Sequence, residues 1–403
     1  MIKAAILGHG TVGSGVYEVC VMNAEKIARV VGEPVEIKYI LDLRDFSSLP
    51  YGEKFVDDFS VIEQDPEITV VAEVMGGVGA AYTFTKRCLE AGKSVCTSNK
   101  ELVATKGCEL LQIAAAHNVN YLFEASVGGG IPIIRPLLQC LAANEFNEIC
   151  GILNGTTNYI LTQMIHNGVT FADALRQAQV NGYAEKDPTA DIEGHDACRK
   201  ICILANLAFG DWFDPDTVSC EGITNITLED VANADQLGCV IKLLGRTVRR
   251  EDGRAYAYVA PHFIHKENPL ASVEDVFNAI MVDGNATGNV MFYGKGAGKL
   301  ATASAVVADI LDCIMHRDQP RCVSWGDGSQ QLLCPLDTLQ SEWYVRFKGE
   351  RQALEAALPV ESITEPAPGV LVVQTNKMST ADMREKLNLL RESGAVCAAI
   401  RIL

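Results

Sequence analysis

The amino-acid sequence predicts an α/β protein, and three regions of the chain support this. Strand-like and helix-like segments alternate through residues 3–123, which is typical of a doubly wound parallel sheet. Residues 218–259 alternate less regularly and indicate an open mixed sheet. Residues 340–403 follow the order βαββαβ, which predicts a small ferredoxin-like unit. The 403 residues are enough for two to three domains.

The first strand is expected at residues 3–7, and GHGTVG follows at 8–13 before a helical stretch. A G-x-G-x-x-G between a strand and a helix is the Rossmann fingerprint. Its glycines allow a tight turn, close approach of a pyrophosphate and helix–strand packing. The pyrophosphate is expected on the helix N-terminus. The alternative is a glycine-rich turn without a ligand. The predicted cofactor contacts here are Gly8, Gly10, Thr11, Val12 and Gly13.

The second strand, at residues 35–41, leads into Asp42 and Arg44. An acidic residue there would bind the ribose hydroxyls of NAD, and an arginine would pair with the 2′-phosphate of NADP. Both are present, so the pattern leaves the choice open. We favour NADP(H), with Arg44 as the contact and NAD(H) as a possible alternative.

Later strands end close to polar or glycine-rich turns. The strand at 70–75 ends at Gly76, and the strand at 94–97 ends at Ser98, Asn99 and Lys100. Ligands of doubly wound sheets bind beyond these carboxyl ends. Lys100 is therefore predicted to contact cofactor or substrate, although a surface lysine at a helix start is an equal alternative.

Glu124 begins a sharp turn that contains three consecutive glycines, Gly128–Gly130. Exposed carbonyls together with Glu124 would suit a hard cation. A simple domain crossover is the alternative, and the two are compatible. A helix is expected at 133–142.

Two further turns precede helices. NGTTN follows a strand at 148–153, and Thr156 or Thr157 is expected to cap the next helix, at 159–167, rather than to line a pocket. GKGAG at 294–298 precedes a helix at 303–316 and suits close approach to a cofactor, although a plain turn is nearly as well supported.

The stretch Asn181–Lys200 concentrates carboxylates ahead of an apolar helical run. Asp196 and Lys200 are four residues apart, so a helix places them on one face. A lysine beside carboxylates can donate a proton, and carboxylates can hold a cationic substrate. The alternative is a solvated salt bridge on a surface helix. The carboxylates are Glu185, Asp187, Asp191, Glu193 and Asp196.

The net charge of −17 argues against nucleic acid and anionic membranes as partners. No signal peptide or membrane-length apolar run is visible, and the 14 cysteines form no CxxC pair. We expect a cytoplasmic protein with reduced thiols and no zinc site. The predicted domains are a dinucleotide-binding domain at 1–132 completed by 296–320, a catalytic and dimerisation domain at 133–295, and an ACT-like domain at 340–403.

Several motifs taken together resemble homoserine dehydrogenases, in family order over residues 1–316. The resemblance implies NAD(P)H-dependent, reversible reduction of L-aspartate 4-semialdehyde to L-homoserine, in threonine and methionine biosynthesis. The motifs are GHGTVGSG, VVAEVMGG, TSNKELVATKG, FEASVGGGIPIIRPL, GILNGTTNYIL, GYAEKDPTADIEGHDACRK and GKGAGKLATASAVVADI.

The resemblance also implies residue roles. Lys200 corresponds to the residue that donates a proton to the carbonyl oxygen. Lys100 corresponds to a residue that contacts cofactor and substrate and assists this proton transfer. Glu185 and Asp196 correspond to the residues that hold the substrate, with Glu185 also near the cofactor. Gly182 and Gly298 correspond to further cofactor contacts. The monovalent cation site, for Na⁺ or K⁺, corresponds to Glu124 and the backbone of Val127, Gly129 and Ile131.

Two departures from the family pattern matter. His9 replaces a more usual apolar residue, and we expect no effect because its side chain should point away from the sharp contact. The C-terminal unit lacks the Pro-Gly that normally opens the first ACT helix, since Pro368-Gly369 falls later. Threonine feedback is therefore not expected, and a homodimer or homotetramer contact is at least as well supported. The alternative functions are a related Rossmann amino-acid dehydrogenase and a non-catalytic nicotinamide-sensing protein.

Overall fold

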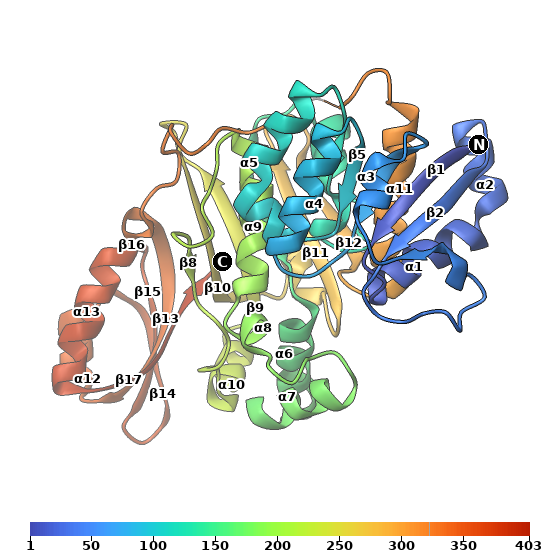
Figure 1. The fold of residues 1–403 in the computed structure, drawn as a ribbon. Helices are drawn as coiled ribbons and strands as arrows, with labels where there is room; N and C mark the ends of the chain where they lie inside the picture. Colours follow the sequence, from blue (N-terminus) through green and yellow to red (C-terminus); the bar gives the residue numbers. More distant parts are fainter. Residues whose placement is uncertain (322) are drawn as a thin grey trace. The chain divides into compact units, whose positions relative to one another are not determined.

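The computed structural model describes residues 1–321 and 323–403, and the chain divides into two compact units (Figure 1). Each unit is assembled from stretches that are far apart in the sequence. Unit 1 comprises Met1–Glu145, Cys202–Pro215 and Phe292–Gln330, and unit 2 comprises Phe146–Ile201, Asp216–Met291 and Gln331–Leu403.

Unit 1 contains a parallel sheet in the order β3-β2-β1-β4-β5-β6, which confirms the predicted doubly wound sheet. The chain runs from β1 to β2 and β3 on one side and then returns to β4 on the other. The strand order therefore reverses between β1 and β4, and ligands bind at such switch points. The strands are β1 (Ile2–Leu7), β2 (Val35–Leu41), β3 (Phe55–Val56), β4 (Ile68–Glu73), β5 (Ser94–Thr97) and β6 (Tyr121–Leu122).

One face of this sheet is covered by α1 and α11, whose Val16 and Ile310 share a core with Ile6 of β1. Because side chains alternate along a strand, Leu7 lies on the opposite face. The helix α11 comes from a late part of the sequence, so the N-terminal strands alone cannot bury this face. The helices are α1 (Thr11–Met22), α2 (Ala24–Val31), α3 (Ser60–Gln64), α4 (Gly79–Glu90), α5 (Lys100–Ala116) and α11 (Lys299–Met315), with 3₁₀ turns η1 (Gly52–Lys54) and η2 (Glu124–Ser126).

The helix predicted at 133–142 is shorter and wider than expected. It is a π-helix, η3 (Pro136–Cys140), in which the Leu141 N–H donates to the Pro136 carbonyl at 2.9 Å. Proline has no N–H to donate, so regular α-helical bonding is interrupted at this point.

Unit 2 is built on a mixed sheet whose main path is β12-β11-β7-β9-β10-β17-β13-β15-β14. This agrees with the predicted open mixed sheet. Ten of the eleven residues of β10 are buried, so its two faces are both covered. The strands are β7 (Phe146–Ile152), β8 (Ser219–Cys220), β9 (Cys239–Arg249), β10 (Ala255–His265), β11 (Phe277–Gly284), β12 (Gly288–Lys295, which ends in unit 1), β13 (Gln340–Gly349), β14 (Val360–Ala367), β15 (Val370–Thr375), β16 (Met378–Ser379) and β17 (Gly394–Ile402).

The predicted βαββαβ order of the C-terminal residues is confirmed, with α12 (Arg351–Ala357) and α13 (Thr380–Ser393) packed on one face (Figure 1). Its strands pair antiparallel in the order β17-β13-β15-β14. One feature was not predicted. β17 also pairs parallel with β10, through Arg401 opposite His262, so the C-terminal strands continue the mixed sheet of unit 2.

The expectation that a threonine caps the helix after β7 is wrong. The helix begins at Gly155, and the Asn154 side chain accepts the Thr157 N–H at 2.9 Å. Asparagine reaches the N3 amide as well as threonine does, and it comes first in the turn. The remaining helices are α6 (Gly155–Asn167), α7 (Phe171–Val180), α8 (Thr189–Ile192), α9 (His195–Phe209, which continues into unit 1) and α10 (Leu228–Gln236), with η4 (Pro269–Ser272) and η5 (Leu336–Thr338).

Within the described residues, no helix is both long and apolar enough to cross a membrane. The cysteines among them are all free thiols.

Candidate active site

The fingerprint glycines form the turn between β1 and α1, and each has its own geometric role. Gly8 has φ +97°, in the region that L side chains rarely adopt. A Cβ on Gly13 would lie 2.0 Å from the Gly8 carbonyl oxygen, so only glycine allows α1 to pack this closely. A Cβ on Gly10 would meet nothing within 4 Å. Gly10 therefore borders open space, as close approach of a pyrophosphate requires.

Thr11 and Val12 are the first residues of α1, where Thr11 is exposed and Val12 is half-buried. Gly10 is the N-cap, and no capping side chain among the described residues accepts the first N–H groups of the helix. These groups and the helix dipole together attract an anion. The turn thus has the geometry of a pyrophosphate site.

Asp42 and Arg44 form a bidentate pair immediately after β2. Arg44 Nε donates to Asp42 Oδ1 at 3.0 Å, and Nη2 donates to Oδ2 at 2.8 Å. The backbone N–H groups of Arg44 and His9 donate to the same two oxygens at 3.0 and 2.8 Å. The Arg44 hydrogen bonds above all hold the pKa of Asp42 well below its usual range. A carboxylate accepts about four hydrogen bonds, so this one is fully used.

The His9 side chain is only 6% exposed and packs among aromatic rings. Its ring centroid lies 4.8 Å from that of Phe46 and 4.9 Å from that of Phe55. Burial lowers the pKa of His9. The imidazole therefore acts as a neutral group that packs against Phe46 and Phe55.

Lys100 is the first residue of α5, whose N-cap is Asn99. The Asn99 side chain accepts the Leu102 N–H at 3.1 Å and donates to the Gly77 carbonyl at 2.6 Å. Asn99 thereby joins the start of α5 to the turn after β4. The sequence did not single out Asn99 for this purpose, although its position before a helix was a visible signal.

In unit 2, Asp196 and Lys200 lie on one face of α9 as predicted, with Lys200 Nζ 2.6 Å from Asp196 Oδ2. The alternative of a solvated surface pair is wrong, because the two residues are only 6% and 8% exposed. Lys200 Nζ also donates to the Leu153 carbonyl at 2.7 Å. An ammonium group is thus held in place within a largely dry environment.

Asn154 connects this pair to a second carboxylate. Its Nδ2 donates to Asp196 Oδ2 at 2.9 Å and to Asp191 Oδ1 at 2.7 Å. Burial, and then the nearby Asp196 charge, raise the pKa of Asp191. Thr156 donates from Oγ1 to the Tyr183 carbonyl at 2.7 Å and so ties α6 to the turn after α7. Sequence reasoning missed Asn154, whose signal was its place directly after a buried strand.

Glu185 and Gly182 lie in that turn between α7 and α8. Both are exposed, and Gly182 has φ +75°, where an added Cβ would meet nothing within 4 Å. The Glu185 carbonyl accepts from Gln179 Nε2 at 3.2 Å. Glu185 therefore lies in the turn before α8, which contains Asp191, and before α9, which contains Asp196.

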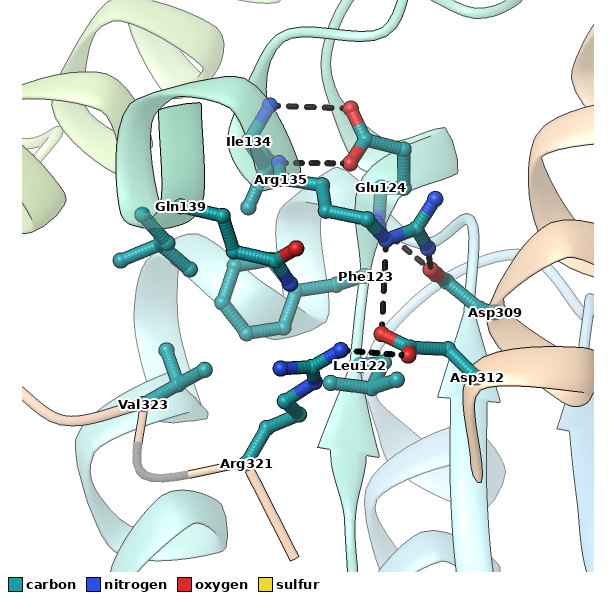
Figure 2. A pocket seen from close by; sticks show the side chains of 11 residues that line it. Leu122, Phe123, Glu124, Ile134, Arg135, Gln139, Asp309, Asp312, Arg321 and Val323 are labelled. Atoms are coloured by element: carbon teal, nitrogen blue, oxygen red, sulfur yellow. Dashed lines mark hydrogen bonds and ion pairs between the residues drawn. The ribbon is translucent and has the colours of Figure 1, made fainter. Parts of the chain in front are cut away.

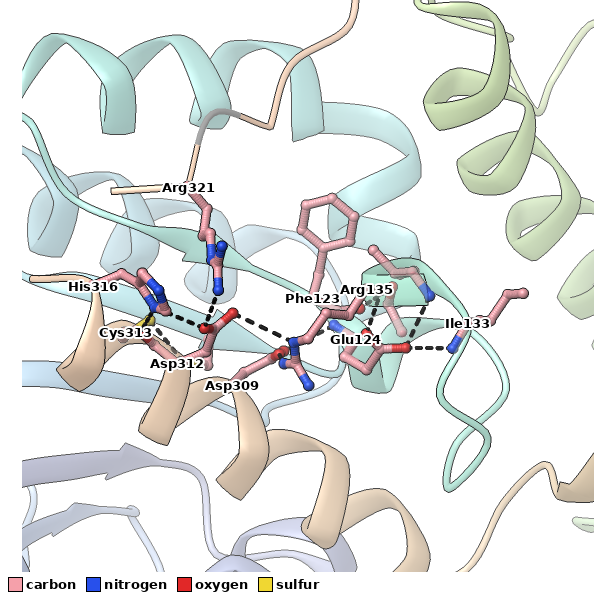
Figure 3. A network of polar contacts seen from close by, with 12 residues as sticks. Phe123, Glu124, Ile133, Arg135, Asp309, Asp312, Cys313, His316 and Arg321 are labelled. Atoms are coloured by element: carbon pink, nitrogen blue, oxygen red, sulfur yellow. Dashed lines mark hydrogen bonds and ion pairs between the residues drawn. The ribbon is translucent and has the colours of Figure 1, made fainter. Parts of the chain in front are cut away.

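The Glu124 carboxylate is buried and accepts three backbone N–H groups, of which those of Ile134 and Arg135 are seen in Figure 2 and that of Ile133 in Figure 3. Oε1 accepts from Ile133 at 2.6 Å and from Ile134 at 2.9 Å, and Oε2 accepts from Arg135 at 2.7 Å. By the usual count of about four acceptor positions, one remains for another ligand. Glu124 therefore serves first as an anchor for the turn that leads into η3.

Val127, Gly129 and Ile131 lie in this turn. The side chains of Val127 and Ile131 are buried. Gly129 has φ +54°, and a Cβ there would lie 2.4 Å from the Gly296 carbonyl oxygen. The Gly130 N–H donates to the Lys295 carbonyl at 3.1 Å. The two glycine-rich turns of unit 1 thus pack on each other. Gly298, with φ +126°, is the N-cap of α11 at the end of the second turn.

A chain of ion pairs continues from Glu124 (Figure 3). Asp309 accepts the Glu124 N–H at 2.8 Å and pairs with Arg135, whose Nε lies 3.4 Å from Asp312 Oδ2. Arg321 donates to Asp312 Oδ1 at 3.1 Å. These side chains line a cavity of about 220 Å³, in which the two guanidinium groups approach Asp312 from different sides (Figure 2). The two guanidinium groups face the carboxyl groups of Asp309 and Asp312, and burial raises the pKa of Asp309 to about 8 against the opposing effect of Arg135.

The predicted site residues are therefore divided between the units. Unit 1 holds the fingerprint, Arg44, Lys100, Gly298 and the Glu124 turn, and unit 2 holds Asp196, Lys200, Glu185 and Gly182. The first set has the geometry of a dinucleotide site. The second set has a buried lysine with carboxylate partners.

Comparison with known proteins identifies the family of the chain. The family profile described as homoserine dehydrogenase matches residues 132–311, and the profile described as homoserine dehydrogenase, NAD binding domain, matches residues 8–124. The homoserine dehydrogenase of Synechocystis sp. is 41% identical over 360 residues, covering 86% of this chain and 82% of that protein. That of Pseudomonas aeruginosa is 40% identical over 357 residues, covering 87% and 82%.

Solved structures give the same result. A homoserine dehydrogenase from Thiobacillus denitrificans superposes with a TM-score of 0.92 at 34% identity, covering 100% of this chain and 98% of that one. A hyperthermophilic archaeal homoserine dehydrogenase mutant in complex with NADPH superposes with a TM-score of 0.67 at 28% identity, covering 77% and 97%. The chain is therefore an oxidoreductase with a nicotinamide-binding Rossmann domain and belongs to the homoserine dehydrogenase family.

Proposed function

We propose that the protein catalyses the reversible, NAD(P)H-dependent reduction of L-aspartate 4-semialdehyde to L-homoserine, in threonine and methionine biosynthesis. A bound reduced nicotinamide supplies the hydride to the aldehyde carbon. The observation that carries the proposal is the buried Asp196–Lys200 pair, because the oxygen of the aldehyde becomes anionic and needs a proton.

In this mechanism the Lys200 ammonium donates a proton to the developing alkoxide. Asp196, itself held by Asn154, keeps Lys200 in one orientation. Glu185 and Asp196 hold the amino and hydroxyl groups of the substrate, and Lys100 assists at the cofactor. In the reverse direction, Lys200 takes the proton back from the homoserine hydroxyl as hydride leaves the carbon.

The experiment that tests this role compares Lys200→Ala with Lys186→Ala. Lys186 is exposed in the turn between α7 and α8, so its replacement controls for the loss of one positive charge. General acid catalysis contributes about 10²–10⁴-fold, and we expect a loss of that size in kcat for Lys200→Ala alone. The assay follows the absorbance of reduced nicotinamide with aspartate 4-semialdehyde, and cofactor binding should survive. Full turnover by Lys200→Ala would refute the mechanism. No turnover by wild-type protein that binds cofactor would favour the nicotinamide-sensing alternative or another amino-acid dehydrogenase.

We further propose that NADP(H) is preferred over NAD(H). Support comes from the hydrogen bonds of Asp42, whose acceptor positions are filled and so are not free for a ribose 2′-hydroxyl. Arg44 keeps unused N–H donors, and its side chain is 62% exposed. An exposed guanidinium at this position suits a 2′-phosphate.

We propose that a monovalent cation, Na⁺ or K⁺, binds at the Glu124 turn. Since the Glu124 carboxylate already accepts three N–H groups, the carbonyls of Val127, Gly129 and Ile131 would supply most of the ligands. Such oxygen ligands suit a hard cation. Activity in NaCl or KCl should exceed activity in the same concentration of tetramethylammonium chloride, and equal rates would count against the site.

We also propose a homodimer or homotetramer. The terminal strand β12 exposes Met291 at 40% and Tyr293 at 55%, and an edge strand with apolar residues is suited to pairing with a second copy. Light scattering after size-exclusion chromatography would measure the mass. A mass of 43.5 kDa at micromolar concentration would identify a monomer and refute the proposal.

A further inference from the structure

Glu73 is a fully buried carboxyl group at the carboxyl end of β4, in a strand whose other buried residues are apolar. It lies beside the switch point of the sheet, because β4 pairs with β1 through Leu7 opposite Glu73. A charged group in such a place is costly unless it is hydrogen-bonded. The contacts of the Glu73 carboxyl group therefore indicate its role in the protein.

Two donors meet the Glu73 carboxylate. The Met75 N–H donates to Oε1 at 2.7 Å, and Thr97 Oγ1 donates to Oε2 at 2.6 Å. Thr97 Oγ1 in turn accepts the Asn99 N–H at 2.9 Å. Glu73 thus fixes the turn after its own strand and, through Thr97, the turn after β5.

Both turns lie at carboxyl ends of strands, where ligands of doubly wound sheets bind. The turn at Met75 packs against the fingerprint, since a Cβ on Gly8 would lie 2.9 Å from Met75 Cγ. The turn at Asn99 starts α5, where Lys100 is the first residue. Asn99 closes the arrangement by donating to the Gly77 carbonyl at 2.6 Å. One buried carboxylate therefore organises the carboxyl ends of two adjacent strands.

The protonation state of Glu73 determines whether these contacts are satisfied. The ionised group accepts from both neighbours, and both neighbours are donors. A proton on Oε2 would face the hydrogen of the Thr97 hydroxyl. The Thr97 hydroxyl group would then have to rotate away from its present position. Burial raises the pKa of Glu73 to about 7, with Thr97 and Met75 opposing the shift, and no charged side chain among the described residues contributes. The titratable neighbour is Tyr121 of β6, whose pKa is raised by burial and then by the Glu73 charge.

We propose that Glu73 is a positioning residue for the reaction, whose ionised carboxylate holds the Met75–Gly77 turn and the start of α5 in the geometry that cofactor and Lys100 require. This rests on the proposed function for its catalytic consequence. Its effect on cofactor binding does not depend on which substrate is turned over. A proton on Glu73 releases the arrangement, so both binding and rate should fall on the acid side of neutrality.

The test measures NADPH dissociation constants and kcat/KM from pH 5.5 to 9 for matched variants. The amide of Glu73→Gln cannot accept hydrogen bonds from both neighbours. One hydrogen bond to a charged group is worth about 1.5–3 kcal/mol, so we expect kcat/KM at pH 8 to fall at least about 10-fold. We also expect the acid limb, which is the fall in kcat/KM at low pH, to be flattened. Thr97→Val removes a donor to the charged form and should move the acid limb upward by about one pH unit. Thr97→Ser keeps the hydroxyl and should return the acid limb to its wild-type position.

Thr85→Val is the control, because Thr85 is fully buried and its hydroxyl has no hydrogen-bond partner among the described residues. It should leave binding and the pH profile unchanged. If Glu73→Gln fails to fold, the Thr97→Val and Thr97→Ser pair decides the matter. An acid limb that is the same in wild type, Thr97→Val and Thr97→Ser would overturn the proposal. Failure of the proposed reaction would instead abolish turnover in the wild type while the pH dependence of NADPH binding persists.

Discussion

Asp230 on α10 anchors the C-terminal strands to the rest of unit 2 through a buried ion pair. Arg346 of β13 donates from Nε to Asp230 Oδ1 at 2.9 Å and from Nη2 to Oδ2 at 3.1 Å. The Tyr344 hydroxyl donates to Oδ1 at 2.9 Å. Asp230 also completes a capping box with Thr227. The Asp230 and Arg346 side chains are 0% and 11% exposed, so water cannot replace the lost contacts in a variant.

Replacing Asp230 with alanine should therefore be strongly destabilising. Removing one partner of a buried pair costs about 3–5 kcal/mol, because it leaves an uncompensated charge. Loss of the capping box adds about 1 kcal/mol. The total of about 4–6 kcal/mol corresponds to a fall in Tm of about 10–20 °C for a unit of this size. Thermal unfolding followed by circular dichroism measures it.

Two variants make this prediction specific. Asp235 lies on the same helix and pairs with Lys266, but its side chain is 74% exposed, so Asp235→Ala should cost less than about 0.5 kcal/mol. The double variant Asp230→Leu with Arg346→Met removes both charges and should be more stable than Asp230→Ala alone. The reasoning is refuted if Asp230→Ala unfolds within about 1 kcal/mol of wild type, or if the double variant is the least stable of the set.

Three further predictions concern unit 1. Arg44→Ala should weaken NADPH binding about 10-fold or more and leave NADH binding nearly unchanged, because a charge-assisted pair to phosphate is lost; equal losses for both cofactors, by fluorescence titration, would contradict the proposed role. Gly10→Ala should fold normally yet lose NADPH affinity, whereas Gly13→Ala should lower Tm, because its Cβ would lie 2.0 Å from the Gly8 oxygen; identical behaviour of the two variants would count against the assigned glycine roles. Glu73 has a folded-state pKa raised from 4.5 to about 7, so its contribution to stability is complete below pH 4.5 and is lost as pH rises through 7. Glu73→Gln should therefore gain Tm relative to wild type at pH 8 by the equivalent of up to about 3 kcal/mol and show no gain at pH 4.5; a gain that is independent of pH would show that ionisation is not its cause.

Most of the parallel sheet of unit 1 was predictable because its longer strands are short apolar runs, and β1, β4 and β5 are each followed by a turn and a helix. The two-residue strand β3 was not predicted. The fingerprint was predictable for the same reason, since the roles of Gly8 and Gly13 depend on local backbone geometry. The i,i+4 spacing of Asp196 and Lys200 also predicted their contact. Their burial was not predictable, because it depends on how α9 packs within the fold, and the charges alone suggested a surface.

The residues that sequence reasoning missed act through long-range contacts. Asn154 and Asp196 are separated by 42 positions, and Glu73 and Thr97 by 24, yet each pair is hydrogen-bonded. No local pattern specifies such partners. Glu73 did leave a signal, because a carboxylate that interrupts an apolar strand requires an explanation. The pairing of β17 with β10 left no comparable signal, since strand neighbours are a property of the whole sheet.

The interleaved course of the chain has a consequence for its synthesis on the ribosome. One face of the sheet of unit 1 remains incompletely covered until α11, at Lys299–Met315, has emerged. The sheet of unit 2 is not complete until β17 pairs between β10 and β13. Nascent chains therefore carry incomplete apolar surfaces for most of translation and need protection from aggregation. A chain that stops before Gly394 would leave two strand edges open at the centre of a sheet, and we expect it to be degraded rather than to persist as a shorter enzyme.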